Sequence, residues 1–356
     1  MRHVSASDQT PTSLPGYDVP AVEAWIGAHT ELAGPFRWTK LPGGHSNLTY
    51  LLEADDGTEA VVRRPPEGEL LPKAHDMGRE WKIISALHGR GVPVATPYGF
   101  CEDPGVTGAH FYVMSKVPGK AMYTSDDVED WLDMDARANV GPSFIDTLAA
   151  LHSLDPTEIG LGDLGRHDGY VQRQLRTWYG SWTASAEAAD YDDDRVHDLH
   201  ARLSASIPEA GPARVVHGDF GLHNVMLERD GTVAAVLDWE IATLGDPLAD
   251  FAYSINAWDQ PASPAPGTSG PPTTAVGISP TAELIDRYAE KTGADLSRLQ
   301  FYRAFNSFKT ACILHGVYAR YRMGQKSTEG VDMQGLFDRM VGAITTCAAA
   351  AEAEGI

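Results

Sequence analysis

Three residues between positions 215 and 250 have the types and the spacing that phosphoryl transfer needs. Asp219 lies in an HGD triplet, Asn224 follows five positions later, and Asp238 comes after two predicted strands. Transfer to a hydroxyl requires a carboxylate that orients the hydroxyl and accepts its proton, and oxygen ligands that hold magnesium against the phosphates. Asp219 is therefore the candidate catalytic base, and Asn224 and Asp238 are the candidate magnesium ligands.

Each of these residues taken alone has a simpler explanation. An aspartate after glycine often organises a turn, and Asp238 is also suited to cap the start of a helix. The pattern around them favours a functional role, because Asp230-Gly231 predicts a hairpin turn between strands at 224–227 and 233–237. Antiparallel pairing of those strands brings the two candidate magnesium ligands to the same end of the hairpin.

The elements that must position these residues change in kind along the chain. The first third is rich in β-prone segments together with two helical segments, and helical spacing prevails beyond residue 120. The predicted strands are 48–52, 59–63 and 111–115, and the predicted helices include 19–32, 78–89, 249–258, 281–291, 297–322 and 331–353. Strands first and helices later predict an α+β protein of two unequal lobes. Its predicted parts are a flexible arm (1–19), an N-lobe that binds nucleotide (20–118), and a C-lobe for catalysis and substrate binding (119–356).

Composition excludes several classes of partner. Lys and Arg number 28 against 49 Asp and Glu, a net charge of −21, which disfavours nucleic acid and anionic membrane surfaces. No run of about 18 apolar residues exists that would span a membrane, and the first residues lack the apolar stretch of a secretory signal. Three widely spaced cysteines are typical of buried free thiols in a reducing compartment. We therefore expect a cytoplasmic protein with neither a nucleic acid nor a membrane as partner.

The motifs HGDFGLHN, LPGGHSNLTYLL, VVRRPP and GDPLADFAY resemble those of the aminoglycoside phosphotransferase family. The likeness is to the branch related to the kinase-like domains that are fused to acyl-CoA dehydrogenases. It implies a two-lobed protein-kinase-like fold, with a small β-rich N-lobe and a larger helical C-lobe, that uses ATP and Mg. Within the catalytic region the resemblance implies that Asp250 braces the loop through its backbone and that His217 packs beneath it. The resemblance implies no role for His223.

On the nucleotide side the resemblance implies a phosphate-covering turn and a hinge. Ser46 and Asn47 belong to a glycine-containing turn, whose exposed N–H groups can meet phosphate oxygens. At the hinge, the adenine edge meets the carbonyl of Ser115 and the N–H of Val117. These backbone contacts do not distinguish ATP from GTP.

Arg63 is a departure from the family pattern. It stands where the family usually has a lysine that contacts the phosphates and pairs with a helix glutamate, here Glu80. Arginine offers a planar fork in place of a point charge, which changes the expected geometry at the phosphates. The neighbouring Arg64 is therefore kept as an alternative partner of Glu80. The alternative explanation for Arg63 and Glu80 is an ion pair on the protein surface with no role in nucleotide binding.

The predicted function is ATP- and Mg-dependent transfer of a phosphoryl group to a hydroxyl of a small molecule. The branch resemblance favours a hydroxyacyl-CoA-type metabolite, and an aminoglycoside-type antibiotic is the alternative acceptor. A nucleotide-binding module without useful transfer is the rival of another class, motivated by Arg63. A protein kinase is disfavoured because no APE-like segment follows Asp238. Candidate walls of the acceptor pocket are Trp178–Trp182, Glu240, the proline-rich stretch 260–280, and the helix 301–321.

Overall fold

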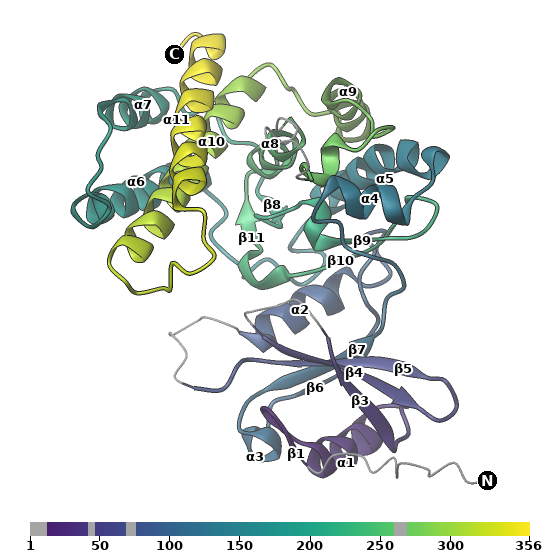
Figure 1. Cartoon of the computed structure of the whole chain (residues 1–356). Coiled ribbons are helices and arrows are strands. Elements are labelled where there is room, and N and C mark those ends of the chain that lie inside the picture. Colours follow the sequence, from purple (N-terminus) through teal and green to yellow (C-terminus); the bar gives the residue numbers. More distant parts are fainter. Residues whose placement is uncertain (1–12, 42–46, 69–75, 260–268) are drawn as a thin grey trace. The chain divides into compact units, whose positions relative to one another are not determined.

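The structure is a computed structural model that describes residues 13–41, 47–68, 76–259 and 269–356. The chain divides into two compact units (Figure 1). The first unit contains the described residues up to Lys120 together with 226–228 and 233–240. The second unit contains residues 121–225, 229–232 and 241 to the end. Sheet and hairpin strands prevail in the first unit and helices in the second, as the predicted order of elements requires.

The first unit is built on a five-stranded antiparallel sheet with the strand order β3-β4-β5-β7-β6. Its strands are β3 (Phe36–Lys40), β4 (Leu48–Ala54), β5 (Glu59–Arg64), β6 (Pro97–Cys101) and β7 (Phe111–Ser115). The three predicted strands are confirmed as β4, β5 and β7, whereas β3 and β6 were not predicted. In the register of the sheet, Arg63 lies opposite Thr49 on β4 and Tyr112 on β7.

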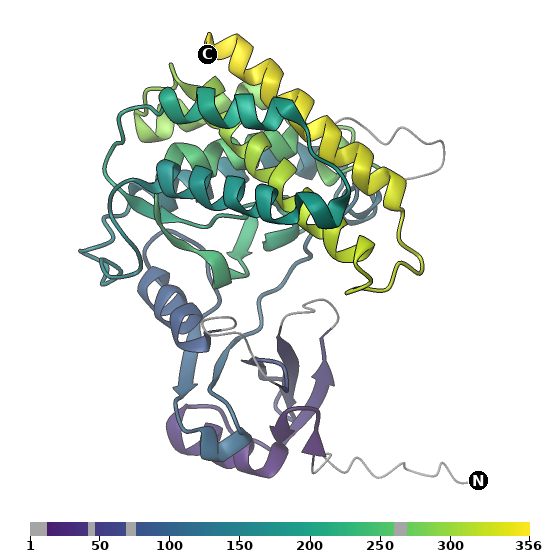
Figure 2. The same cartoon turned by 90° about the vertical axis from the view of Figure 1, so that its left-hand side faces the viewer.

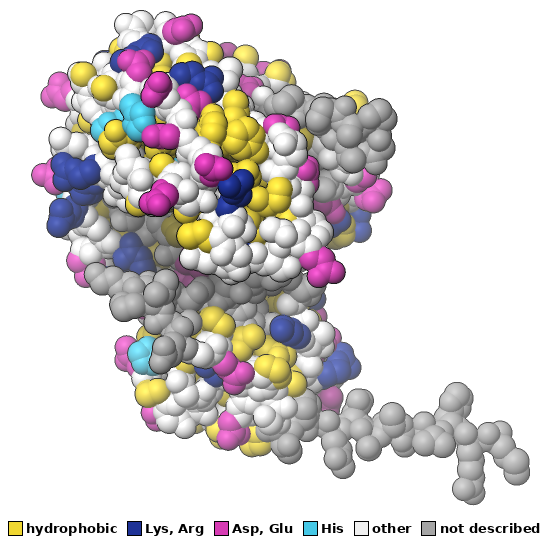
Figure 3. Space-filling model, turned by 60° about the vertical axis from the view of Figure 1, so that its left-hand side comes forward, with side chains coloured by type: hydrophobic (Ala, Val, Ile, Leu, Met, Phe, Trp, Pro, Cys, Tyr) yellow, Lys and Arg dark blue, Asp and Glu magenta, His cyan; other side chains and the backbone are white. Residues whose placement is uncertain are grey.

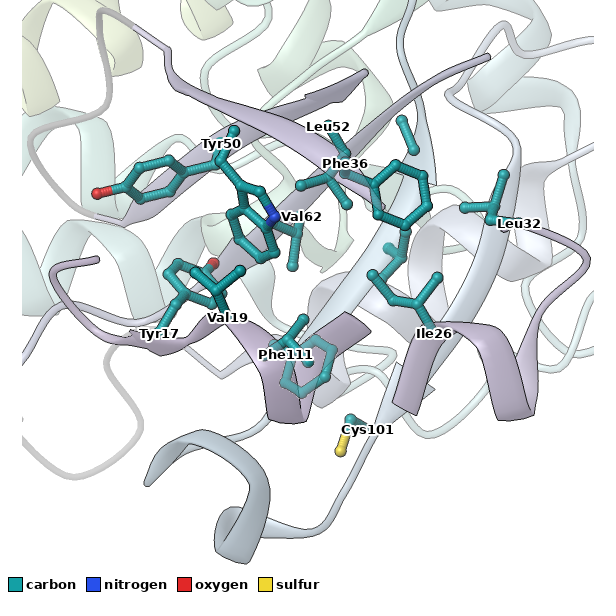
Figure 4. Packing of buried hydrophobic residues seen from close by; sticks show 14 residues of the cluster. Tyr17, Val19, Ile26, Leu32, Phe36, Tyr50, Leu52, Val62, Cys101 and Phe111 are labelled. Atoms are coloured by element: carbon teal, nitrogen blue, oxygen red, sulfur yellow. The ribbon is translucent and has the colours of Figure 1, made fainter. Parts of the chain in front are cut away.

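One face of this sheet is covered by helix α1 (Val19–His29). Asp18 caps the start of the helix, and Val22 and Ile26 pack among buried side chains of the sheet such as Phe36 (Figure 4). Residues 13–18, which were predicted to belong to a flexible arm, instead form two short strands, β1 (Ser13–Leu14) and β2 (Tyr17–Asp18). Tyr17 is only 2% exposed and joins the same core, which holds this segment in place. Residues 1–12 of that arm lie outside the described residues.

Helix α2 (Met77–Leu87) belongs to the same unit and carries one of the predicted site residues. Asp76 caps its first turn, accepting a hydrogen bond from the backbone N–H of Arg79. Its buried positions recur at helical spacing, which confirms the predicted helix. They are Met77, Glu80, Ile83, Ile84 and Leu87. Glu80 therefore lies on the apolar face of α2, where a carboxylate needs polar partners.

The hairpin that was predicted from Asp230-Gly231 is present as β9 (Val225–Leu227) and β10 (Val233–Val236). Leu227 also exchanges two backbone hydrogen bonds with Lys120, each of 3.0 Å. Gly119 is needed here, since its φ is +116° and a Cβ would lie 2.6 Å from the carbonyl oxygen of Leu227. The close approach of the Leu227 backbone therefore requires glycine at position 119, just after the predicted hinge residues Ser115 and Val117.

The second unit is mainly helical. Its helices are α4 (Ser125–Trp131), α5 (Met134–Ser153), α6 (Tyr170–Ala189), α7 (Asp194–Ala205), α8 (Pro247–Trp258), α9 (Thr281–Thr292), α10 (Leu299–Arg322) and α11 (Met333–Glu354). The predicted helices of the last 110 residues are confirmed within a few positions. Helix α10 is central to the packing, since it contacts α6, α8 and α11 (Figure 2). A short antiparallel pair, β8 (Arg214–Val216) and β11 (Thr243–Gly245), lies next to the HGD motif, which directly follows β8.

Charges of both signs are interspersed on the face of the second unit drawn in Figure 3. The cysteines Cys101, Cys312 and Cys347 are buried and free, as predicted. Among the described residues, no helix is both long and apolar enough to cross a membrane.

Candidate active site

The HGD motif follows strand β8 and is held by a buried carboxylate of α8. Asp250, in the first turn of α8, accepts the backbone N–H of His217 at 2.7 Å and that of Gly218 at 2.8 Å. His217 is fully buried, and its ring nitrogen Nδ1 lies 3.3 Å from the backbone N–H of Asp219. The brace that the resemblance implied for Asp250 is therefore present in the second unit. It places the loop through backbone groups, so it does not depend on the side chains of the loop.

Asp250 is itself supported by a buried network. His152 lies 3.3 Å from its Oδ2, and the other ring nitrogen of His152 lies 2.8 Å from the hydroxyl of Tyr288. Burial alone would raise the pKa of Asp250. The hydrogen bond and charge of His152, the charge of His217 and the Gly218 N–H outweigh burial, so the pKa of Asp250 is lowered. The carboxyl is therefore an ionised acceptor at neutral pH.

Replacing Asp250 by asparagine is expected to destabilise the protein by about 2–3 kcal/mol, because an amide keeps one acceptor oxygen for two buried N–H groups. The folded pKa of Asp250 lies below the unfolded value of about 3.9. Its stabilising contribution is thus present above about pH 4 and is lost as the pH falls through the folded pKa. Urea denaturation of both proteins at several pH values should show a difference in unfolding free energy that shrinks below about pH 4. Asp198→Asn, at an exposed ion pair with Arg202, is the control and should change stability by less than about 0.5 kcal/mol.

Asp219 accepts hydrogen bonds on both of its carboxylate oxygens. The hydroxyl of Tyr253, on α8, donates to Oδ1. Nε2 of His223 lies 3.3 Å from Oδ2, and Nδ2 of Asn224 donates to the same oxygen at 3.0 Å. Burial would raise the pKa of Asp219, but the bonds from His223 and Tyr253 and the charges of His223 and His217 lower it. The carboxylate is one-third exposed, so it is an ionised group that a ligand can reach.

Asn224 is oriented by the same loop. Its side-chain nitrogen also donates to the backbone carbonyl of Asp219 at 3.0 Å, and the residue ends the 3₁₀ turn η1 (Leu222–Asn224). Because Nδ2 is committed to Asp219, the amide oxygen is the end that remains for a cation. Amide and carboxylate oxygens are the ligand types that Mg²⁺ accepts alongside phosphate oxygens.

The first unit holds the other predicted site residues around Arg63. The Nε of Arg63 lies 3.2 Å from Glu80, and its Nη2 lies 3.1 Å from Asp238. The hydroxyl of Tyr112 donates a hydrogen bond of 2.9 Å to the same Glu80 carboxylate. Arg64 instead points to the carbonyls of Gly16 and Thr107. Arg63 is therefore the partner of Glu80, and the alternative through Arg64 is wrong.

Negative charge exceeds positive charge in this cluster. Burial is the main cause that raises the pKa of Glu80, and the nearby carboxylates Asp238 and Glu240 raise it further against the lowering effect of Arg63 and Tyr112. One arginine thus faces three carboxylates. Within the described ranges, no group of three or more His, Cys, Asp or Glu side chains is arranged to hold a metal ion, so an ion bound by Asp238 would take most of its ligands from phosphates and water. Asp238 also has a φ of +60°, a conformation that non-glycine residues rarely adopt and that often marks functional positions.

Replacing Glu80 by alanine is expected to destabilise the first unit by about 3 kcal/mol, as typically follows the loss of one partner of a buried ion pair. The Glu80 side chain is 2% exposed, and its removal leaves Tyr112 without its acceptor. Urea denaturation followed by tryptophan fluorescence measures the effect. Glu53→Ala at the exposed pair with Arg37 is the control, and it is expected to lower the stability much less, because water screens an exposed pair. Equal losses in the two variants would contradict a buried, structural pair.

The remaining predicted nucleotide contacts are placed as follows. Asn47 is buried, and its side-chain nitrogen lies 3.5 Å from Glu80. Ser46 lies outside the described residues. Ser115 ends β7 and is tied to Thr96 by its backbone N–H and its hydroxyl, and Val117 follows in the segment before Gly119. A nucleotide contact for any of these residues stays a prediction.

A pocket of about 420 Å³ lies in the second unit beside the catalytic loop. It is lined by aromatic, small and hydroxyl-bearing residues, and His223 and Tyr253, which both bond Asp219, are among them. The other lining residues are Tyr123, Thr124, Phe144, Gly221, Leu222, Ser254, Ala257, Trp258, Ser269, Gly270, Pro271, Pro272 and Thr273. No Asp, Glu, Lys or Arg of the described chain lines it. A second pocket, of about 280 Å³ beside His167 and Asp246, contains none of the predicted site residues.

The structure corrects part of the prediction of which residues line the acceptor pocket. Trp182 is fully buried and stacks on His315 at 3.8 Å, and Phe305 and Phe308 of α10 are also core residues. Aromatic residues at helical spacing here serve packing. The described part of the proline-rich stretch, residues 269–273, does line the pocket, and residues 260–268 lie outside the described residues.

Two residues near Asp219 were missed in the sequence. Tyr253 follows Asp250 by one helical turn, so both face the catalytic loop, and that spacing is a signal that could have found it. Lys309 donates to the carbonyl of Gly218 at 3.3 Å, and its ammonium lies 5.2 Å from the ring centre of Tyr253. Burial lowers the pKa of Lys309, against the charges of Asp250 and Asp219. No periodicity signals this contact, because it joins residues 91 positions apart.

The β-rich unit with its buried ion pair and the helical unit with its braced HGD loop are those of a protein-kinase-like fold. The sequence pattern of the phosphotransferase enzyme family matches residues 37–302. The chain therefore belongs to this family, and the predicted fold class is confirmed.

The relatives agree with the branch that the motifs indicated. The chain is 35% identical over 324 residues to acyl-CoA dehydrogenase family member 11 of Rattus norvegicus, which covers 88% of the chain and 41% of that relative. The chain thus spans less than half the length of such relatives.

Solved structures give the same fold. A Ralstonia eutropha protein provisionally described as an aminoglycoside phosphotransferase is similar with a TM-score of 0.79 and 31% identity, over 94% of this chain and 98% of that one. An aminoglycoside phosphotransferase in a ternary complex with AMP-PNP and hygromycin B is similar with a TM-score of 0.57 and 15% identity, over 93% and 98% of the two chains. This second likeness concerns the fold alone.

Proposed function

We propose that this protein is a Mg²⁺-dependent kinase that transfers the γ-phosphoryl group of ATP to a hydroxyl of a small molecule. The observation that carries the proposal is the arrangement of Asp219. It is a partly exposed carboxylate with a lowered pKa, on a loop braced by Asp250, and two of its hydrogen-bond partners line a pocket. A base that is held in place, partly exposed and bonded to residues of a pocket suits a hydroxyl nucleophile.

In the proposed reaction the acceptor hydroxyl donates its hydrogen bond to Asp219. Its oxygen attacks the γ-phosphorus, the bond from that phosphorus to the bridging oxygen of ADP breaks, and the hydroxyl proton passes to Asp219. Positioning supplies most of the acceleration, since the protein forms no covalent bond with the phosphoryl group. The bonds from His223 and Asn224 to Oδ2 keep the carboxylate in one orientation.

Asn224 and Asp238 would hold Mg²⁺ through an amide oxygen and a carboxylate oxygen. The ion, when bound, would neutralise charge on the phosphates. Arg63, oriented by Glu80, would contact a phosphate of the nucleotide, and Ser46, Asn47, Ser115 and Val117 would complete the nucleotide site. The complex of the aminoglycoside phosphotransferase with AMP-PNP supports a nucleotide as the donor.

The acceptor is proposed to be a hydroxylated metabolite, with a hydroxyacyl-CoA-type compound as the favoured class. The relatives named for acyl-CoA dehydrogenases support this choice. The pocket does not separate the two classes, because its described lining has neither the carboxylates that would suit a polycationic antibiotic nor the Lys or Arg side chains that would suit the phosphates of a CoA ester. An aminoglycoside-type acceptor remains the alternative.

A screen of hydroxylated compounds with ATP and Mg²⁺ tests the proposal. Phosphorylation of hydroxyacyl thioesters in preference to aminoglycosides is the expected result. Faster transfer to an aminoglycoside would support the alternative acceptor. ATP binding without transfer to any acceptor would instead indicate a nucleotide-binding module, and transfer to protein serine would indicate a protein kinase.

A further inference from the structure

The two oxygens of Asp219 are held in different ways. Oδ2 accepts bonds from His223 and Asn224, which lie four and five positions along the same loop. Oδ1 accepts the hydroxyl of Tyr253, which comes from α8, 34 positions away. The catalytic loop therefore fixes Oδ2 by itself, whereas the partner of Oδ1 belongs to another element.

Tyr253 lies at the boundary between Asp219 and the pocket. Its side chain lines the pocket with Ser254, Ala257 and Trp258 of the same helix, and its hydroxyl reaches back to Oδ1. His223, one of the two donors to Oδ2, also lines the pocket, whereas Asn224 is buried and does not. Oδ2 thus carries two donors from its own loop, and Tyr253 is the donor that α8 contributes to Oδ1 beside the pocket.

The ring of Tyr253 is held in turn by Lys309. The ammonium of Lys309 lies 5.2 Å from the ring centre and donates to the carbonyl of Gly218 at 3.3 Å. A cation above an aromatic face is attracted to it, so the lysine fixes the ring relative to the HGD loop. Tyr253, Lys309 and the HGD loop are thus connected to one another by hydrogen bonds and a cation–π contact.

We infer that Tyr253 is a positioning residue that occupies Oδ1 of Asp219 while the acceptor pocket is empty and so suppresses phosphoryl transfer to water. In the suppressed side reaction a water oxygen attacks the γ-phosphorus of ATP, the bond to the bridging oxygen of ADP breaks, and the water proton goes to Asp219, giving ADP and phosphate. Water must compete with the tyrosine hydroxyl for Oδ1 to take this route. An acceptor bound in the pocket has its own binding energy to displace that hydroxyl, which water lacks.

This inference rests on the proposed kinase function, and Tyr253→Phe tests it with two readouts. The first is the rate of acceptor-independent ATP hydrolysis divided by the rate of transfer to the acceptor. We expect this ratio to rise roughly fivefold, the effect of losing one hydrogen bond, with ATP affinity unchanged. Lys309→Met should raise it in the same direction. Tyr191→Phe, which also removes a tyrosine hydroxyl bonded to an aspartate, Asp193, is the matched control and should leave it unchanged.

The second readout needs no turnover. In the enzyme without nucleotide, a water-soluble carbodiimide with an amine should label Asp219 several times faster in Tyr253→Phe than in the wild type or the control, as measured by peptide mass spectrometry. Equal labelling, or hydrolysis and transfer that fall in proportion, would overturn the inference and leave Tyr253 a structural residue. A wild type that labels as expected but phosphorylates no acceptor would refute the kinase function alone.

Discussion

Asp219→Asn is expected to lower the rate of phosphoryl transfer by about three orders of magnitude, within the range for loss of a general base. The amide keeps the shape of the side chain but cannot take the proton of the acceptor hydroxyl. Nucleotide binding should be retained, because the proposed nucleotide contacts come from other residues. Steady-state transfer assays and calorimetric titration with a non-hydrolysable ATP analogue measure the two quantities separately.

The control for this variant is Asp295→Asn, an exposed loop aspartate that accepts a backbone N–H from Ser297. It should behave as the wild type in both measurements. Transfer by Asp219→Asn that stays within about tenfold of the wild type would show that another group accepts the proton, since loss of a base costs at least about a hundredfold. Loss of nucleotide binding would show instead that Asp219 has a structural role.

The HGD region could be predicted from the sequence because its signals are local. The Asp230-Gly231 turn between two apolar runs specifies the hairpin, and Asp250 is placed by α8, in whose first turn it lies. Helices α9 to α11 follow from apolar spacing and are correct within a few residues. In such segments the apolar residues that recur in the sequence are the residues that form the buried face of the helix, so the sequence is enough to predict the element.

Long-range contacts could not be read in this way. Arg63 and Asp238 are 175 positions apart, and spacing alone does not bring them together. The resemblance to a family supplied the pairing of Arg63 with Glu80, while the choice between Arg63 and Arg64 required the sheet. Alternation along β5 places consecutive arginines on opposite faces, one toward α2 and one toward the Gly16 carbonyl.

The acceptor wall was the least predictable part of the site. Trp182 and the aromatic residues of α10 have the composition of a binding surface, yet they fill the space between α6, α10 and α11. Burial of large rings stabilises a helical core as strongly as it would a ligand, so residue type does not separate the two roles. The pocket is instead lined by residues from several elements, with α8 and the segment 269–273 among them.

Asp238→Asn is expected to reduce Mg²⁺-dependent transfer by at least about a hundredfold and to raise the Mg²⁺ concentration needed for half-maximal rate. The magnitude is that of removing one electrostatic stabiliser of the transferring group. Asparagine tolerates a positive φ as aspartate does, so the backbone at +60° is preserved while the charge is lost. Rates measured across a magnesium titration, at saturating ATP, give both effects.

Asp190→Asn provides the matched control for this variant. Asp190 also has a positive φ, of 52°, but it caps the end of α6 and accepts a hydrogen bond from Arg322. It should keep the magnesium dependence of the wild type, which separates loss of charge at the ligand from disturbance of a left-handed backbone. If Asp238→Asn also kept that dependence, Asp238 would not be a metal ligand, and its bond to Arg63 at 3.1 Å would then be the reason for its strained conformation.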